Sequence, residues 1–229
     1  MRHIVRAIAI VAGVVALTAA FTSVALAQEW PWAQINADGF GAVQNADVTS
    51  LAMHGGALYA GAANATTGAE IWRYASGVWS SVATGGWGVG SALSTPWAMA
   101  SYAGSLYVGT NQAQVWAYDG VAWSLSGTLG GPTVNVTSLA AYGGNLYAGT
   151  WDAVNGAELW RFNGLVWASV MTGGFTDQGS PVTITVVSAL HVHNGLLYVG
   201  TGDGPGASQL WAYDGTTFTR VDGGAFSAR

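Results

Sequence analysis

The sequence contains no cysteine and no lysine, and charged residues make up only 7% of its 229 residues. Without cysteine the chain cannot form disulfides, thiolate metal sites or a cysteine nucleophile. Without lysine it has no group for Schiff-base chemistry or for the lysine of a phosphate-binding P-loop. Six basic residues against eleven acidic ones exclude a nucleic-acid partner bound through a basic patch.

Glycine and aromatic side chains are abundant. The chain holds 34 glycines and 12 tryptophans, and 51% of its residues are hydrophobic. This proportion is enough to build a packed core and is unlike that of a disordered, charge-rich chain. The composition therefore favours a globular, weakly acidic β protein.

Residues 1–27 have the features of a cleavable export signal. Arg2 and Arg6 precede an almost wholly apolar stretch, and Ala25-Leu26-Ala27 supplies the small-x-small pattern that signal peptidase requires. We expect cleavage before Gln28 and a mature chain that is secreted, periplasmic or on the cell surface, with no membrane contact after cleavage. The alternative is an uncleaved membrane anchor, since the apolar stretch approaches the ~20 residues that span a bilayer.

The remainder of the chain contains four copies of one sequence unit. Each copy opens with a short apolar run, continues with a Leu-Tyr-small-Gly string and an aliphatic-Trp pair, and has a further aromatic residue after that pair. Each copy therefore contains four β-type segments. The strings begin at Leu58, Leu106, Leu146 and Leu197, the pairs end at Trp72, Trp116, Trp160 and Trp211, and the further aromatics are Trp79, Trp123, Trp167 and Phe218.

Pairs that contain glycine connect these segments. Gly55-Gly56 and its counterparts join the first segment to the second, and Ser76-Gly77, Asp119-Gly120 and their counterparts join the third to the fourth. Such pairs accept the positive φ angles of tight hairpins. Four antiparallel strands in a repeat of about 40–50 residues predict a β-propeller blade. We expect an all-β propeller domain over residues 28–229, with blades at approximately 48–84, 97–127, 136–171 and 186–222.

The two ends of the repeat region do not match. Trp32-Ala33-Gln34-Ile35, followed by Gly39-Phe40-Gly41, copies the fourth strand and link of a blade, which predicts an orphan outermost strand without a blade of its own. The fourth copy already has an outer strand at residues 217–222. We therefore expect an incomplete ring, or one that closes by self-association through open blade edges. The alternative is a four-bladed ring with a redundant strand.

In such a blade the two hairpin turns lie on one side of the disc and the loop between the second and third strands lies on the other. The hairpin turns are short and uniform, whereas these loops vary, and binding residues concentrate on variable loops held by a rigid scaffold. The position six residues after each repeated Leu is polar in all four copies, and Trp151 adds an aromatic platform. We expect a carbohydrate or protein ligand to contact Asn64, Gln112, Trp151, Asp152 and Asp203. The alternative is that the Asn and Asp side chains only form the loops, by bonding their own backbone.

The histidines do not complete a metal site. His191 and His193 share one face of a strand and could form a metal pair, but no third ligand is visible. His193 aligns with His54, Tyr102 and Tyr142 of the other copies, which indicates a recurrent packing position. We expect no metal and no cofactor.

Charged residues recur in the first and third copies. Glu70 with Arg73 and Glu158 with Arg161 stand where the other two copies carry glutamine and alanine. Residues three apart on a strand point to opposite faces, so we expect these side chains to form ion pairs between blades. The alternative is a glycosidase carboxylate dyad. We expect no catalytic residues, and the alternation suggests duplication of a two-blade unit.

Residues 32–74, with their Gly-Phe-Gly link, Leu-Tyr-x-Gly string and Thr-Gly-Ala-Glu-Ile-Trp-Arg-Tyr segment, resemble the secreted bacterial propeller repeats related to kelch repeats. This resemblance covers nearly all of the mature chain and implies the fold, but no particular activity. A second resemblance is to the tryptophan-docking repeats of quinoprotein-type propellers. Ala62-x-Asn64-x-x-Thr67-Gly68-x-x-x-Trp72 has their spacing, with Asn in place of Asp, and implies a motif that locks neighbouring blades together.

The sequence as a whole favours an exported, non-catalytic β-propeller that acts as a binding or interaction scaffold, with glycans as one class of ligand. Four polar positions on one side would suit weak, multivalent recognition of a repeating sugar. The alternatives are a fragment of a propeller enzyme, of the glycosidase, lyase or quinoprotein type, and a piece of a larger adhesive surface protein.

Overall fold

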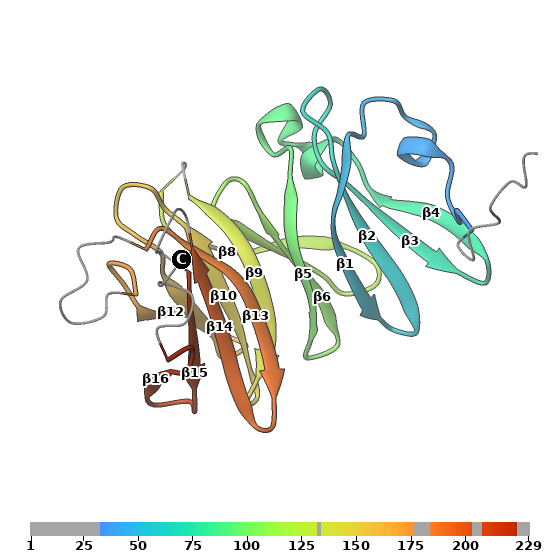
Figure 1. Ribbon diagram of the computed structural model, residues 1–229. Helices are drawn as coiled ribbons and strands as arrows, with labels where there is room; N and C mark the ends of the chain where they lie inside the picture. The colour runs from blue at the N-terminus through green and yellow to red at the C-terminus, as the bar shows by residue number, and fades with distance from the viewer. Residues whose placement is uncertain (1–32, 132–133, 176–183, 203–207, 224–229) are drawn as a thin grey trace, which may run out of the picture. The chain divides into compact units, whose positions relative to one another are not determined.

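The computed structural model describes residues 33–131, 134–175, 184–202 and 208–223 (Figure 1). The chain divides into two compact units, Met1–Ile35 and Asn36–Arg229, and the second contains every strand and helix described below. The expected export signal at residues 1–27 lies outside the described residues.

Four groups of four antiparallel strands follow one another along the chain, and we call them sheets 1 to 4. Sheet 1 contains β1 (Asp47–His54), β2 (Ala57–Ala63), β3 (Glu70–Ala75) and β4 (Val78–Ala83). Sheet 2 contains β5 (Pro96–Tyr102), β6 (Ser105–Thr110), β7 (Gln114–Tyr118) and β8 (Trp123–Thr128). Sheet 3 contains β9 (Asn135–Tyr142), β10 (Asn145–Trp151), β11 (Leu159–Phe162) and β12 (Trp167–Met171). Sheet 4 contains β13 (Val186–His193), β14 (Leu196–Gly202), β15 (Gln209–Tyr213) and β16 (Phe218–Arg220).

Within each sheet every strand pairs with the next one in sequence, which confirms the expectation of an all-β protein made of antiparallel four-stranded units. One antiparallel pair links sheets 3 and 4, between Trp151 at the end of β10 and Val186 at the start of β13. The described residues contain no α-helix, only the short 3₁₀ turns η1 (Asp38–Gly41), η2 (Gly85–Gly88) and η3 (Gly90–Ala92). In this part of the chain no helix has the length and apolar character needed to cross a membrane.

The hairpin turns explain why the repeats fold alike. Gly143 and Gly144 have φ of 55° and 77°, and Asn194 and Gly195 have 47° and 76°, as two-residue hairpins require. The turns that join the third strand to the fourth differ from the expected two-residue type in sheets 2, 3 and 4, but not in sheet 1. In sheets 2, 3 and 4 an Asp or Asn side chain accepts hydrogen bonds from two backbone N–H groups ahead of it, so the turn is four residues long and needs one glycine.

Three hydrophobic clusters lie between consecutive sheets. The first lies between sheets 1 and 2 and includes Ile71 and Val108, the second lies between sheets 2 and 3, and the third lies between sheets 3 and 4. The sheets therefore pack face to face in sequence order, with their first strands β1, β5, β9 and β13 next to one another (Figure 1).

The third-strand tryptophans occupy equivalent positions but are half-buried rather than enclosed. An aromatic residue from the preceding link packs against three of them: Phe40 stacks on Trp72 and Trp87 stacks on Trp116, with ring centroids 5.0 and 5.8 Å apart. Phe175 contacts Trp211 with ring centroids 6.0 Å apart, but these two rings are tilted by 48° rather than stacked. Residues 33–35, part of the expected orphan strand, are not in a strand, and Trp32 lies outside the described residues.

Candidate functional site

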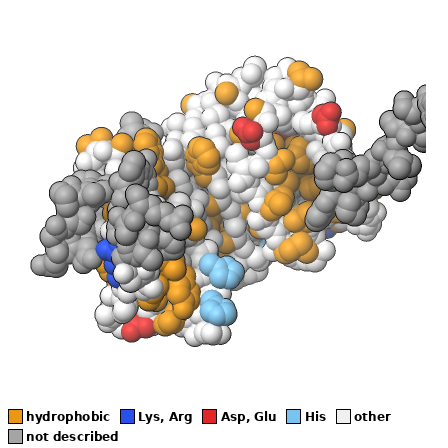
Figure 2. All heavy atoms as spheres, viewed as in Figure 1, with side chains coloured by type: hydrophobic (Ala, Val, Ile, Leu, Met, Phe, Trp, Pro, Cys, Tyr) orange, Lys and Arg blue, Asp and Glu red, His pale blue; other side chains and the backbone are white. Residues whose placement is uncertain are grey.

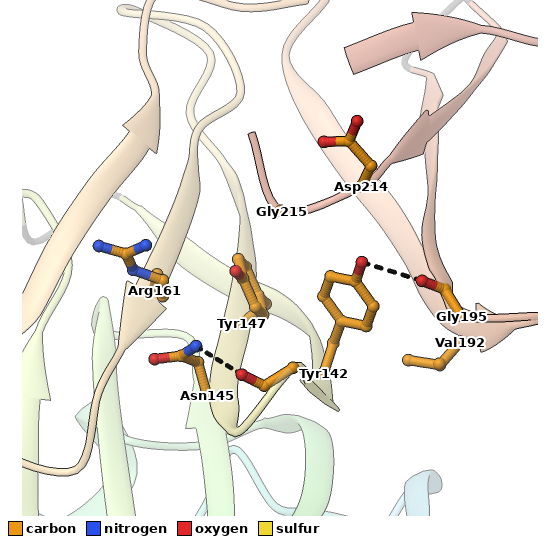
Figure 3. A pocket seen from close by; sticks show the side chains of 9 residues that line it. Tyr142, Asn145, Tyr147, Arg161, Val192, Gly195, Asp214 and Gly215 are labelled. Atoms are coloured by element: carbon orange, nitrogen blue, oxygen red, sulfur yellow. Dashed lines mark hydrogen bonds between the residues drawn. The ribbon is translucent and has the colours of Figure 1, made fainter. Parts of the chain in front are cut away.

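A pocket of about 600 Å³ opens between sheets 3 and 4, on the side of the hairpin turns (Figure 3). Sheet 3 provides its first wall and the turns of sheet 4 provide the second. It is lined by Tyr142, Gly143, Asn145, Tyr147, Arg161, Val192, Gly195, Asp214 and Gly215. The sequence expectation placed ligands at the opposite, loop side.

Strand register sets the sheet 3 wall. Tyr147 of β10 and Arg161 of β11 are direct cross-strand partners, so their side chains leave the same face of the sheet. Figure 3 shows Arg161 beside Tyr147, and Asp214 above Tyr142 in the view, on the turn of sheet 4. The pocket thus has a cation on one wall and a carboxylate on the other.

Asp214 is fixed by its own turn. Its Oδ1 accepts hydrogen bonds from the Thr216 hydroxyl and from the backbone N–H groups of Thr216 and Thr217, each 2.7 Å long. These bonds stabilise the charged form and lower the pKa of the Asp214 carboxyl below its ordinary value. The carboxylate is therefore ionised at neutral pH and held in one direction.

The tyrosines have different roles. Tyr147 is 2% exposed, and burial raises the pKa of its hydroxyl, with Arg161 acting in the opposite direction. Tyr142 is half-buried, and its hydroxyl donates to the Gly195 carbonyl at 3.0 Å, which ties the end of β9 to the next hairpin. Tyr142 therefore offers the aromatic surface that a ligand in this pocket can contact.

A second pocket, of about 360 Å³, occupies the equivalent place between sheets 1 and 2. Here Tyr59 and Arg73 are the cross-strand partners, and the turn of the facing sheet contributes Gly120. The full lining consists of His54, Gly55, Tyr59, Arg73, Ser80, Val82, Tyr118 and Gly120. The same arrangement therefore recurs two sheets apart.

The middle junction, between sheets 2 and 3, has a different composition. Tyr107 has Ala117 as its cross-strand partner instead of arginine, and Phe162 takes the place of a tyrosine. Phe162 packs against Tyr102 and Tyr107 with ring centroids 6.2 and 5.9 Å apart. An arginine therefore marks every second junction.

Two of the predicted ligand residues have their polar atoms engaged within their own loops. Asn64 is 1% exposed, and its Oδ1 accepts from the backbone N–H groups of Thr66 and Thr67. Asp152 is 6% exposed and accepts from Val154 and Asn155. Burial raises the pKa of the Asp152 carboxyl, but the hydrogen bonds together lower it by more, so the net shift is downward. Loop formation, the alternative role considered above, accounts for these contacts, and ligand binding by both residues stays a prediction.

Of the other three residues predicted to contact a ligand, two are among those that the structure describes. Gln112 is half-buried and donates to the Ala92 carbonyl at 2.9 Å. Trp151 is half-buried at the end of β10. Asp203 lies outside the described residues. The structure does not gather these residues into one of the pockets described above.

The prediction that Glu70 and Glu158 form ion pairs between blades is wrong, because both carboxylates accept a tryptophan N–H of their own repeat. Glu158 accepts the indole N–H of Trp160 at 2.8 Å, and Glu70 accepts that of Trp72 at 2.9 Å. Gln114 and Gln209 do the same for the tryptophans of sheets 2 and 4. Residues two apart share a strand face, so the acceptor side chain and the tryptophan lie side by side. A carboxylate and an amide each offer an oxygen that can accept the indole N–H.

The sequence distinguishes the two junctions with pockets from the middle one, because arginine recurs in the third strand of the first and third copies alone. Arg73 and Arg161 follow their tryptophans directly, where Ala117 and Ala212 stand in the other sheets. The second wall of each pocket, however, comes from the next sheet and cannot be read from a single repeat. Among the described residues no group of three or more His, Asp or Glu side chains could hold a metal ion, and His191 and His193 are exposed on β13.

The fold, rather than the sequence, relates this chain to known proteins. No protein-family model matches the sequence, and no curated protein matches it. The chain is similar to the SapL1 lectin, in a structure described as a complex with alpha methyl fucoside, with a TM-score of 0.57 and 16% identity over 78% of this chain and 63% of that chain. It therefore spans somewhat less than two thirds of that lectin.

Weaker similarity extends to two further structures. Myxococcus xanthus glutaminyl cyclase has a TM-score of 0.45 and 16% identity over 76% of this chain and 68% of that chain. The computationally designed Ika4 protein has a TM-score of 0.44 and 16% identity over 73% of this chain and 92% of that chain. The similarity to SapL1 identifies the fold of this chain as β-propeller-like.

Proposed function

We propose that this chain is an exported, non-catalytic carbohydrate-binding protein whose sugar sites are the pockets between sheets 3 and 4 and between sheets 1 and 2. The observation that carries the proposal is the repeated Arg–Tyr cross-strand pair facing an Asp-Gly turn of the next sheet. Because the same arrangement occurs at two equivalent junctions, it is not a single pocket formed by chance.

The chemistry of the larger pocket suits a sugar ring. A sugar presents hydroxyls that both donate and accept hydrogen bonds, together with an apolar C–H face. Arg161 donates, the Asp214 carboxylate accepts, and Tyr142 provides an aromatic surface for the C–H face. The volume of about 600 Å³ lies within the range of small-molecule sites.

Two further observations support the proposal. The SapL1 lectin, described in complex with alpha methyl fucoside, shares the propeller-like fold. The two pockets of one chain give two sites on a rigid frame, so a ligand with repeated sugars would gain from avidity although each site binds weakly.

The test is a glycan array followed by titration calorimetry of the best ligand. We expect two sites per chain for the unmodified protein. Arg73→Ala with Arg161→Ala installs the residue found at the equivalent position of sheets 2 and 4, so the fold is retained. Loss of charge-assisted hydrogen bonds worth about 1.5–3 kcal/mol per site predicts affinity about tenfold to hundredfold weaker.

Asp214→Asn is the matched variant on the facing sheet. Asn163 forms the same turn in sheet 3 through its Oδ1, so this change removes the charge without removing the turn. Trp151→Ala with Asp152→Ala tests the loop side. Binding that is unaffected by the arginine changes but lost with the loop-side pair would move the site there, and no bound glycan at all would end the carbohydrate proposal.

A further inference from the structure

Both end faces of the series of sheets are built like the faces that pack on one another inside it. Sheets 2 and 3 have a neighbour on each side, whereas sheet 1 packs only on sheet 2 and sheet 4 only on sheet 3. This leaves one face of sheet 1 and one face of sheet 4 without a neighbouring sheet among the described residues.

The exposed face of sheet 1 is apolar. On β1, Val48 is 51% exposed, Leu51 is 59% exposed and Met53 is 63% exposed. The equivalents of Val48 in sheets 3 and 4, Val136 and Val187, are fully buried against the preceding sheet. Figure 2 shows hydrophobic side chains at the surface in the region where β1 lies in Figure 1.

The internal junctions show what each valine position contacts. A glycine in the second strand of the preceding sheet allows the first strand of the next sheet to approach closely. A Cβ added to Gly109 or Gly149 would come within 3 Å of the side chain of Val136 or Val187, and one added to Gly61 would come equally close to Pro96. We call such a glycine the seat.

Sheet 4 carries a seat that no other sheet of the described residues occupies. A Cβ added to Gly200 would meet nothing nearer than Ala189 of its own sheet, at 3.5 Å. Its cross-strand partner Leu210 is partly exposed, whereas the equivalent Ile71, Val115 and Leu159 are fully buried. Nothing in the local conformation of Gly200 calls for glycine, since its φ is not in the left-handed region.

A hydroxyl beside the seat gives an independent indication. Thr49 and Thr137 each lie near the carbonyl of their own seat glycine and also donate to a first-strand carbonyl of the next sheet, Pro96 or Val187, at 2.7 Å. Ser188 is their equivalent in sheet 4 and contacts the Gly200 carbonyl at 3.2 Å. The carbonyl that would complete its set is that of a residue equivalent to Pro96 and Val187, which is Val48.

We propose that the Gly200 face of one copy of this chain binds the Val48 face of a second copy, in the same geometry that joins sheet 3 to sheet 4. The partner is a second copy because this chain presents both halves of the junction, one at each end of its series of sheets. Ser188 would donate to the Val48 carbonyl of the other copy, and Val48 would cover Gly200 as Val187 covers Gly149. The association is heterologous, so copies join head to tail.

The test starts with the mass of the purified chain, expected to begin at Gln28 after export. We expect a discrete oligomer in analytical ultracentrifugation and native mass spectrometry at micromolar concentration. Gly200→Val blocks the seat, and Val48→Asp places a charge on the opposite face; each alone should weaken association at least tenfold. Val121→Asp is the control, because Val121 is 90% exposed in a turn away from both faces. Unchanged melting temperatures verify that each variant folds.

Mixing the two variants gives the decisive result. Each variant alone has no usable junction, but the mixture has one, between the intact Gly200 face of the Val48→Asp chain and the intact Val48 face of the Gly200→Val chain. We expect mixed dimers of one copy of each variant. A monomeric unmodified chain would overturn the proposal, and so would association that only one of the two changes disrupts or that mixing does not restore.

Discussion

Each third-strand tryptophan has a hydrogen-bond acceptor two residues before it, and the acceptor alternates between glutamate and glutamine along the sheets. The position therefore requires an oxygen atom rather than a charge. Carboxylates at such positions are easily mistaken for catalytic groups or ion-pair partners.

Glu158 provides the first test at this scale. Glu158→Ala leaves the indole N–H of Trp160 without its acceptor in a half-buried place, which should lower the free energy of unfolding by about 1 kcal/mol. Glu158→Gln reproduces the pair found in sheets 2 and 4 and should change stability by less than about 0.5 kcal/mol. Urea unfolding measures both, and equal losses for the two variants would contradict the acceptor role.

Buried tyrosines should make the protein sensitive to alkali. Burial raises the pKa of Tyr107, Tyr118, Tyr147 and Tyr213 above the ordinary 10.0. Above pH 10 the unfolded chain loses phenolic protons that the folded chain keeps, so stability is full below pH 10 and falls as pH rises through the folded-state pKa values. The midpoint of thermal unfolding should therefore drop above pH 10.

Phenolate absorbance supplies the control for that measurement. The phenols of these four tyrosines should ionise together with unfolding, so the rise in absorbance should coincide with the loss of structure. At the acid end the sign is reversed: the pKa values of Asp119, Asp152 and Asp214 are lowered, so their contribution is lost as pH falls below about 3.8. Ionisation of every tyrosine before any loss of structure would contradict the assigned burial.

At the scale of the element, the junction between sheets depends on a glycine that the next sheet covers. Gly149 and Gly200 are equivalent residues in β10 and β14, but only Gly149 has a side chain of another sheet against it. Substitution at Gly149 and at Gly200 therefore distinguishes the stability lost by crowding a junction between sheets from the stability lost by replacing a glycine within a strand.

Gly149→Ala should destabilise the chain by about 1–3 kcal/mol, because the new methyl group overlaps Val187 and Ser138. Gly200→Ala should be neutral or stabilising by up to about 1 kcal/mol, because alanine reduces the freedom of the unfolded chain and meets only ordinary contacts. Thermal unfolding at a concentration where the chain is monomeric makes the comparison. A similar loss from both changes would show that the glycines matter for the strands and not for the junction.

The elements follow from the sequence where one repeat contains the whole cause. The Leu-Tyr-x-Gly strings and the glycine pairs predict the strands and first hairpins, because period-two alternation and positive φ are local properties. The orphan strand was expected from similarity to residues 167–170, but residues 33–35 are not in a strand. The likeness of a short string does not supply the neighbour with which a strand must pair.

The candidate pockets depend on contacts that no single repeat encodes. Arg161 belongs to sheet 3 and Asp214 to sheet 4, and neither looks functional within its own repeat. Conversely, Asn64 and Asp152 recur at equivalent places because their loops need an oxygen that accepts backbone N–H groups. Recurrence in sequence indicates a shared requirement, and only the assembled sheets show whether it concerns the fold or a ligand.

At the scale of the whole molecule, packing is uneven along the series of sheets. Sheets 2 and 3 are covered on both faces, whereas sheets 1 and 4 have one covered face each among the described residues. Opening of an end sheet breaks one junction, whereas opening of a middle sheet breaks two. Stability should therefore be lower at both ends of the series.

Hydrogen exchange followed by mass spectrometry measures this difference. At a concentration where the chain is monomeric, we expect the amides of β6 and β10 to exchange at least tenfold more slowly than those of β2 and β14. The hydrogen-bonded ladders of these strands are alike, so packing accounts for the difference. Equal protection in all four strands would instead indicate that the sheets unfold as one cooperative unit.

The seat glycine and the valine that covers the preceding seat belong to the same sheet, on opposite faces: Gly149 with Val136 in sheet 3, and Gly200 with Val187 in sheet 4. A sheet made in this way carries both halves of its own joint. Gene duplication that copies one sheet therefore copies a ready-made interface, and no compensating mutation is needed to fit the new sheet to its neighbours. Because the arginine recurs at every second junction, duplication of two sheets also copies a pocket. The valency of such a protein is then a trait that a single recombination event between repeats can change.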